Sequence, residues 1–525
     1  MRFAPLTIAL VVLAAQQAAW SQDLPSLASQ PESYSAFPNS PLDLGQPAAR
    51  GTDVETDALR QQLSLLEAQQ RETQLALDQL RQQLGYDRAN QKATVIQDPA
   101  AMIVPPDADT GQAFPNCAEC SPEPTLIERL GTRYNNGFVL VESPDPQRVP
   151  FQLSLNVFNQ FRFLNQNLDT TFTDHLGNVR PVDARNDINV NRNLYYFGGY
   201  AFDPNLIFNV IIWSSNSVAT VIQGGYIGYK FSDSLTLYGG YWGIPGSRSN
   251  TRDFMWLQGV ERSMADSFFR PGFTQGIWLE GNPAPQLYYV AYVGNSMNTL
   301  NINTAKIDKN FVYSTSAWWE PLGDYGPPGA PRMAFSDLES HETAAVRLGT
   351  SFSFAREDRF SNPAINPENV AIYNSDGVLF FETGSLAPGA TVLYADCYIS
   401  SFDFGVKKRG LAFNSQYFFR WLNDFVTDGA VPLSQTYDNG FEASLGYFVV
   451  PQTFEVYGRT SAVFGEFKNS SEYALGTNWH PWHNRGFRII TELNKVEDSP
   501  TASIQTIYNA GMNGWNFVIQ TQLYF

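Results

Sequence analysis

The chain has few cysteines, few charges and, after its first 21 residues, no long apolar run. Only 3 of its 525 residues are Cys, so no disulfide framework holds the fold together. Charged residues make up 16%, against about 25% in an ordinary soluble protein. The net charge of −17 argues against a nucleic-acid partner, because phosphate backbones are bound through Lys and Arg. No later segment is apolar for long enough to cross a membrane as a helix.

Motifs of common enzymes are also missing. The chain has no G-x-S-x-G elbow, no P-loop and no H-E-x-x-H, so the sequence predicts no catalytic residue, no cofactor and no enzyme. His480 and His483 are close in sequence, but no Cys or carboxylate stands beside them at metal-ligand spacing, and no metal site is predicted.

The N-terminus predicts export. Residues 1–21 combine the positive Arg2, an apolar run from residue 6 to 15, and small residues before a cleavage point near Gln22. The run is too short to span a bilayer of ~30 Å as a helix. A buried N-terminal helix is the alternative, but the polar, Pro-rich residues 22–53 give it nothing to pack on. The sequence therefore predicts a signal peptide at 1–21 followed by a flexible spacer at 22–53.

Residues 54–84 contain no Gly or Pro and are dense in Leu, Gln, Glu and Arg. Mostly apolar residues recur in this segment at steps that alternate between four and three residues, which predicts the seam of an α-helical coiled coil. A single amphipathic helix lying on a neighbour is the alternative. The seam is formed by Leu59, Leu63, Leu66, Gln70, Thr73, Leu77, Leu80 and Leu84.

Residues 85–134 form a Pro-rich linker with a C-x-x-C motif at Cys117 and Cys120. Such a pair is a redox site, half of a zinc site or a local disulfide. No second C-x-x-C and no following His accompany it, so a disulfide formed in an oxidising periplasm is favoured.

From residue 135 to 525 the chain alternates apolar and polar residues. In residues 151–164 one face is mainly apolar, from Phe151 to Phe163, and the other carries Gln152, Ser154, Gln160 and Arg162. Strands of ten or more residues suit a tilted membrane strand better than the shorter strands of a soluble β-sandwich, which is the alternative fold. At about 22–25 residues per strand and connection, this region predicts an all-β, transmembrane antiparallel β-barrel of 16 strands, with 18 as the alternative.

The last strand carries the strongest signal. Counting back from the terminus, Phe525, Leu523, Ile519 and Phe517 share one face with Trp515. A chain that ends in Phe on such a strand is similar to the terminal signal that bacterial barrel-assembly machinery recognises, so Phe525 is the predicted assembly signal. Long connections at 245–274, 319–343 and 355–390 alternate with short ones, and we expect the long ones to gather at one end of the barrel.

Residues 239–281 contain Gly240 to Pro245 at the end of a strand, then Glu261-Arg262-Ser263, then Pro271-Gly272 leading to Gly276. This order resembles the phosphate-selective porin O/P family, whose patterns are Gly-Lys-aromatic-Lys-x-Pro, Glu-Arg-Ser and Pro-Gly-Arg-Asp-x-Gly. The resemblance extends over the barrel and implies a trimeric pore whose long third loop narrows the lumen. Two Lys of the family pattern are replaced here by Tyr241 and Gly243, and an Arg-Asp pair by Phe273 and Thr274. Phosphate selectivity, which needs several cationic donors, therefore does not transfer directly.

The resemblance predicts which charges line the pore. In the third loop, the expected constriction residues are Arg248, Arg252, Asp253, Glu261, Arg262, Asp266 and Arg270. Alternation points a second set toward the lumen wall: Arg162, Arg347, Glu442, Glu455, Arg459, Arg488 and Glu492. Each loop Arg could instead pair with a neighbouring acid and only brace the loop. Trp242, Trp479, Trp482 and Tyr524 are expected in the interfacial aromatic girdles.

The sequence thus predicts a bacterial outer-membrane porin for passive diffusion of small polar or ionic solutes, with a periplasmic N-terminal extension. Its expected partners are outer-membrane lipid, the barrel-assembly machinery, two further copies in a homotrimer, and the cell wall through the coiled coil. A plugged structural or adhesive barrel and a secreted β-rich binding protein are the alternatives.

Overall fold

The computed structural model describes residues 134, 137–215, 220–250, 254–297, 306–326, 334–360, 366–503 and 505–525. They belong to a compact unit that runs from Cys117 to Phe525. The predicted segments 1–21, 22–53 and 54–84 lie outside the described residues, as do Cys117, Cys120, Arg252 and Asp253. Among the helices of the described part, none is both long and apolar enough to cross a membrane.

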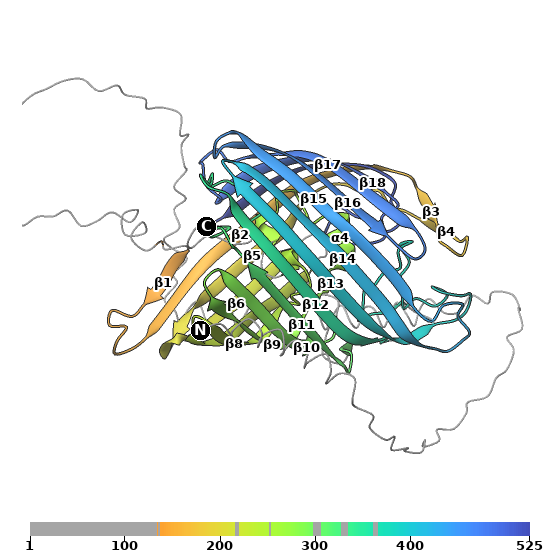
Figure 1. The fold of residues 1–525 in the computed structure, drawn as a ribbon, viewed down its shortest axis with the longest axis horizontal. Coiled ribbons are helices and arrows are strands. Elements are labelled where there is room, and N and C mark those ends of the chain that lie inside the picture. The colour runs from red at the N-terminus through yellow and green to blue at the C-terminus, as the bar shows by residue number, and fades with distance from the viewer. Residues whose placement is uncertain are drawn as a thin grey trace, which may run out of the picture. The chain divides into compact units, whose positions relative to one another are not determined.

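Sixteen antiparallel strands close into a ring, because β19 pairs with β2 and each of the others pairs with the next in the chain. The strands run obliquely beside one another around the barrel (Figure 1). The alternative of 18 strands is therefore wrong. The ring consists of β2 (Phe151–Leu168), β5 (Asn186–Ala201), β6 (Asp203–Ser215), β7 (Thr220–Ser232), β8 (Leu235–Gly243), β9 (Phe273–Ala284), β10 (Leu287–Asn295), β11 (Phe311–Trp319), β12 (Ala345–Asp358), β13 (Val392–Lys408), β14 (Leu411–Thr427), β15 (Thr436–Val450), β16 (Phe454–Phe464), β17 (Asn469–Trp479), β18 (Phe487–Glu497) and β19 (Gly514–Tyr524).

Alternation gives each strand one apolar and one polar face. On β2, Phe161 is 46% exposed while its neighbour Arg162 is fully buried. The same contrast holds on β18, where Leu493 is 45% exposed and Glu492 is fully buried. Because the ring has no free edge, the backbone groups of its strands find partners on both sides, as lipid requires. The apolar faces point outward, where a bilayer would cover them.

Short turns join strands at one end of the barrel. Arg409 and Gly410 connect β13 to β14 with φ of 50° and 81°, the pair of positive φ values that a type I′ hairpin turn requires. Longer connections join the strands at the opposite end, at residues 169–185, 244–272, 359–391 and 498–513. The first of these carries the small hairpin of β3 (Thr171–Thr173) and β4 (Val179–Pro181).

One long connection departs from the expected layout. Residues 320–344 join β11 to β12 at the short-turn end, because Trp319 pairs with Leu287, which directly follows the β9–β10 turn. The expectation that all long connections gather at one end is therefore wrong for this segment. Its described residues 334–344 reach into the barrel, where Phe335, at 6% exposed, is buried.

Both ends of the described chain meet at the short-turn end. Strand β1 (Phe138–Glu142) pairs with the start of β2, and β19 pairs with the rest of β2 along the same edge. Phe525 exchanges two backbone hydrogen bonds with Val157, of 2.8 and 3.1 Å, and its ring lies 5.5 Å from that of Phe138. The terminal Phe is thus part of the seam that closes the ring.

Candidate functional site: a loop folded across the barrel interior

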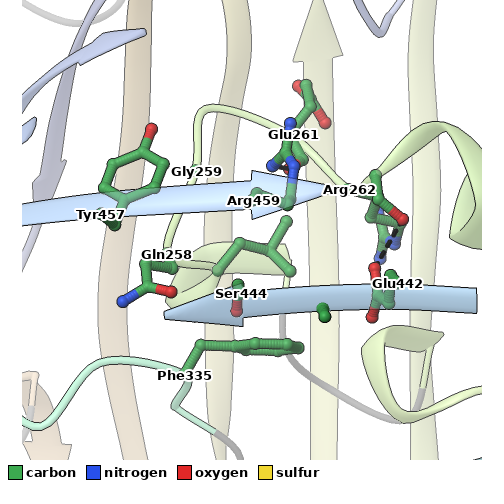
Figure 2. A pocket seen from close by; sticks show the side chains of 12 residues that line it. Gln258, Gly259, Glu261, Arg262, Phe335, Glu442, Ser444, Tyr457 and Arg459 are labelled. Atoms are coloured by element: carbon green, nitrogen blue, oxygen red, sulfur yellow. Dashed lines mark hydrogen bonds between the residues drawn. The ribbon is translucent and has the colours of Figure 1, made fainter. Parts of the chain in front are cut away.

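Residues 244–272, between β8 and β9, fold into the barrel instead of leaving it. Pro245 ends the β8 ladder, and short turns at Arg248–Asn250 and Phe254–Trp256 precede helix α4 (Met264–Phe269). Ser263 caps α4 by accepting a hydrogen bond from the Asp266 N–H. Helix α4 lies against the inner faces of β14, β15 and β16. Figure 2 shows loop residues Glu261 and Arg262 facing Arg459 of β16 and Glu442 of β15.

Glu261 anchors this loop to the seam side of the wall. Its carboxylate receives hydrogen bonds from Arg162 of β2 and from both terminal nitrogens of Arg192 of β5, the latter at 2.6 and 3.0 Å. Asn191 adds a third donor at 3.2 Å. Burial alone would raise the pKa of the Glu261 carboxyl, but the guanidinium groups of Arg192 and Arg162 outweigh it and lower the pKa to about 2. Glu261 is therefore ionised at neutral pH.

Arg459 of β16 forms a second anchor, on the wall to the other side of the β19–β2 seam. It bridges Glu472 of β17 and Glu492 of β18 at 2.9 and 3.1 Å, and donates to the backbone carbonyl of Glu261 at 2.8 Å. Glu472 also accepts the N–H of Met264 at 2.7 Å. Wall charges thus hold the loop through its backbone as well as its side chains.

Tyr508 links this anchor to the connection after β18. Its hydroxyl contacts Glu472 at 2.7 Å and the Arg262 carbonyl at 2.9 Å. Residues 498–513 therefore also reach into the lumen.

Glu455 and Arg488 hold the earlier part of the loop. Gln258 donates to Glu455 at 2.6 Å, and Arg488 donates to the Leu257 carbonyl at 2.7 Å. Ser336, from the connection at the short-turn end, donates to Glu455 at 2.8 Å. Wall, loop and connection thus share one hydrogen-bonded network.

Arg248 and Phe335 mark where the two inserted segments meet. Arg248 donates to Asn414 at 2.9 Å, and its guanidinium lies 4.1 Å from the centre of the Phe335 ring. The Phe335 N–H bonds to the Trp256 carbonyl at 3.1 Å. Residues 320–344 therefore cover the loop from the short-turn end.

Little free space remains beside β15 and β16. The cavity between loop and wall, lined by Gln258, Glu261, Glu442, Tyr457 and Arg459, has a volume of about 20 Å³. This is room for about one water molecule. Side chains of the loop and the wall therefore fill most of the space at this contact.

The structure brings together most of the charges singled out in the sequence. Arg248, Glu261, Arg262, Asp266 and Arg270 lie in the inserted loop. Arg262 donates to Ser249 at 2.8 Å and lies 3.6 Å from Asp266, whereas Arg270 follows the end of α4. All seven wall residues lie on inward faces: Arg162, Arg347, Glu442, Glu455, Arg459, Arg488 and Glu492.

Arg347 stands apart from this network. It pairs with Asp403 at 2.7 Å and lies over the Trp318 ring at 4.9 Å. Of the predicted girdle residues, Trp479 and Trp482 are exposed on the outside. Trp242 faces inward against Trp278, and Tyr524 packs on Trp256, so the girdle prediction is wrong for Trp242 and Tyr524.

Sequence reasoning missed Arg192, Glu472 and residues 320–344. A bulge places Asn191 and Arg192 both inward, so strict alternation fails there. Glu472 follows the alternation of β17 and could have been found. Nothing in the sequence around Phe335 and Ser336 signals that these two residues turn inward. Within the described ranges, no group of three or more His, Cys, Asp or Glu side chains is placed to hold a metal ion.

Comparison with solved structures finds similarity to outer-membrane barrels. No protein-family model and no curated protein matches the chain. Among solved structures, OmpT, an outer-membrane protein of Vibrio cholerae, matches at 12% identity over 71% of this chain and 98% of its own, with a TM-score of 0.44. OprB of Pseudomonas putida matches at 12% identity over 71% of this chain and 94% of its own, with a TM-score of 0.41. A mutant of the Rh. blastica porin matches at 10% identity over 71% of this chain and 100% of its own, with a TM-score of 0.38. At TM-scores below 0.5, the barrel assignment stands on the strand pairing of this chain.

Proposed function

We propose that this protein is a porin of a bacterial outer membrane through which small polar solutes or ions diffuse passively. The observation that supports this most is a closed ring of 16 strands, apolar outside and polar inside, with residues 244–272 folded across its interior. A water-filled lumen needs such an inner face, and an inserted loop sets which solutes pass.

The rest of the assembly follows from the resemblance to the phosphate-selective porin O/P family. It implies a homotrimer, with Phe525 as the signal read by the barrel-assembly machinery. The short-turn end of such barrels faces the periplasm, so an extension that begins beside β1 would lie there. Its predicted coiled coil at 54–84 would reach the cell wall. Cross-linking that recovers the extension without any cell-wall fragment would count against this contact.

A plugged structural barrel is the second candidate, and one observation favours it. Of the described loop charges, Glu261, Arg262 and Asp266 are buried in ion pairs, and the cavity beside β15 and β16 has room for about one water. If this packing persists in the membrane, solutes could not pass along these strands.

Single-channel conductance separates the two candidates. The purified protein is placed in a planar bilayer under a salt gradient, and phosphate is then added. Ohmic steps in groups of three would support an open trimeric pore, and the reversal potential gives its ion preference. Block by low phosphate would support the selectivity of the family, whereas correctly folded protein without conductance would refute the porin and favour the plug.

A further inference from the structure

The inner wall of the barrel is divided into two different halves. Along β14 to β19 it carries mainly amides and charged groups that the inserted segments cover. Their exposure is at most 9% for Asn414, Gln416, Glu455, Arg459, Glu472, Asn478, Arg488, Glu492, Asn494, Asn516, Gln520 and Gln522. This half is sealed against the loop.

The other half, from β5 to β10, is aromatic and partly open. Register and alternation place Tyr200, Tyr226, Trp242 and Tyr288 on its inner face, and all four are half-buried. Part of the lumen surface of the described strands therefore stays accessible on this aromatic side.

Four rings of this wall overlap in nearly parallel orientation. Trp278 stacks with Tyr238 at 5.2 Å and 11°, with Tyr292 at 5.7 Å and 24°, and with Trp242 at 6.3 Å and 22°. Tyr226 meets Tyr238, Trp242 and Trp278 edge-on, at 5.0, 5.5 and 5.9 Å. The rings fit because glycines lie beside them on the same face: a Cβ at Gly228 would lie 2.4 Å from Tyr238, and one at Gly276 2.7 Å from Tyr292.

Polar groups stand beside the rings without forming a cluster of charge. Asn209 pairs in register with Tyr226, and its side-chain oxygen has no hydrogen-bond partner in the described part of the chain. Glu280 accepts the Tyr238 hydroxyl at 3.0 Å. The cations of this half are already engaged, since Arg192 binds Glu261 and Lys230 pairs with Asp233 at 2.7 Å. A phosphate passing here would find no set of converging cations.

We propose that the aromatic half of the lumen, around Tyr226 and Trp242, binds neutral sugars on their way through the pore. The C–H faces of a sugar ring pack on the electron-rich face of an aromatic ring, while its hydroxyls bond to groups such as Asn209 and Glu280. Apolar rings with a few polar groups are the usual lining of a site for an uncharged polar ligand. The proposal builds on the proposed porin function by naming its solute class.

The test measures sugar binding and conduction separately. Maltotriose is added to the folded protein, and both tryptophan fluorescence and single-channel current are followed. We expect a saturable fluorescence change and a saturable block of current, with no block by equal inorganic phosphate. Y226A and W242A should weaken both by about 2- to 12-fold, the range that one aromatic contact contributes.

Y313A is the matched control, because Tyr313 on β11 points outward and is 51% exposed. It should leave maltotriose binding unchanged. Conductance without any response to maltotriose, or equal binding by Y226A and the parent protein, would overturn the sugar proposal and leave the porin intact. Maltotriose binding without conductance would refute the porin and retain the sugar site. Weakening by Y313A equal to that of Y226A would place binding outside the lumen and overturn the proposal.

Discussion

The Glu261 anchor allows a quantitative test of how firmly the loop is held in the lumen. Glu261→Gln keeps the shape of the side chain but removes the charge that faces Arg162 and Arg192, all of which are at most 5% exposed. Removing one partner of a buried ion pair costs about 3–5 kcal/mol, because the remaining charge is left in a poorly solvating site. If the cost falls on the loop-inserted state alone, detachment from β2 and β5 becomes roughly 150- to 5,000-fold more frequent.

The assay is single-channel recording in planar bilayers. E261Q should show larger or more frequent openings than the parent, while the 16-strand ring, which does not depend on this pair, stays folded on electrophoresis without heating. Glu497→Gln is the matched control, because Glu497 pairs with Lys495 on the outer surface at 48% and 39% exposed. Such surface pairs contribute about 0–1 kcal/mol. Recordings of E261Q that cannot be told from those of E497Q would refute the view that this anchor holds the loop.

Three further predictions follow from the same contacts. The pKa of Glu261 is lowered to about 2, below its unfolded value, so the anchor is fully formed above about pH 4.5 and is lost as pH falls toward 2. Single-channel conductance at pH 3 should therefore exceed that at pH 7. An unchanged conductance would contradict this prediction. Arg459→Met leaves Glu472 and Glu492 buried without their cation, so the barrel should lose about 3–5 kcal/mol of unfolding free energy in urea titrations. An unshifted midpoint of the urea transition would show that the bridge contributes nothing to the stability of the barrel. Deleting Phe525 removes its two backbone bonds to Val157 and should lower the amount recovered in outer-membrane fractions, whereas recovery equal to the parent would exclude it as an assembly signal.

Much of the barrel was predictable because strand alternation is a local property. Side chains two residues apart share a face, so Phe161 and Arg162 could be assigned to opposite faces of β2 without knowing what β2 pairs with. The strand count followed from length and came out as one of the two expected values. The terminal strand was predicted for the same reason, since Phe517, Ile519 and Leu523 alternate with Val518, Gln520 and Gln522.

The site was less predictable, because contacts in a lumen depend on how the ring closes. Arg162 and Glu261 are separated by 99 residues and meet because the loop turns inward across the barrel. The bulge at Arg192 reverses the alternation of inward and outward side chains on β5, and no residue type in the sequence predicts this bulge. The inward return of residues 320–344 is likewise a matter of space left by neighbours.

The sequence by itself determined the closed β architecture, the inner and outer faces of its strands and the region that supplies the inserted loop, because each depends on short-range periodicity and turn chemistry. Only the tertiary structure decided which wall that loop seals and which wall stays accessible. Closing the ring brings residues from distant strands to the same height along the barrel axis. The polar half therefore contacts the loop, and the aromatic half faces the rest of the lumen. That division depends on distances across the barrel, which no local pattern encodes.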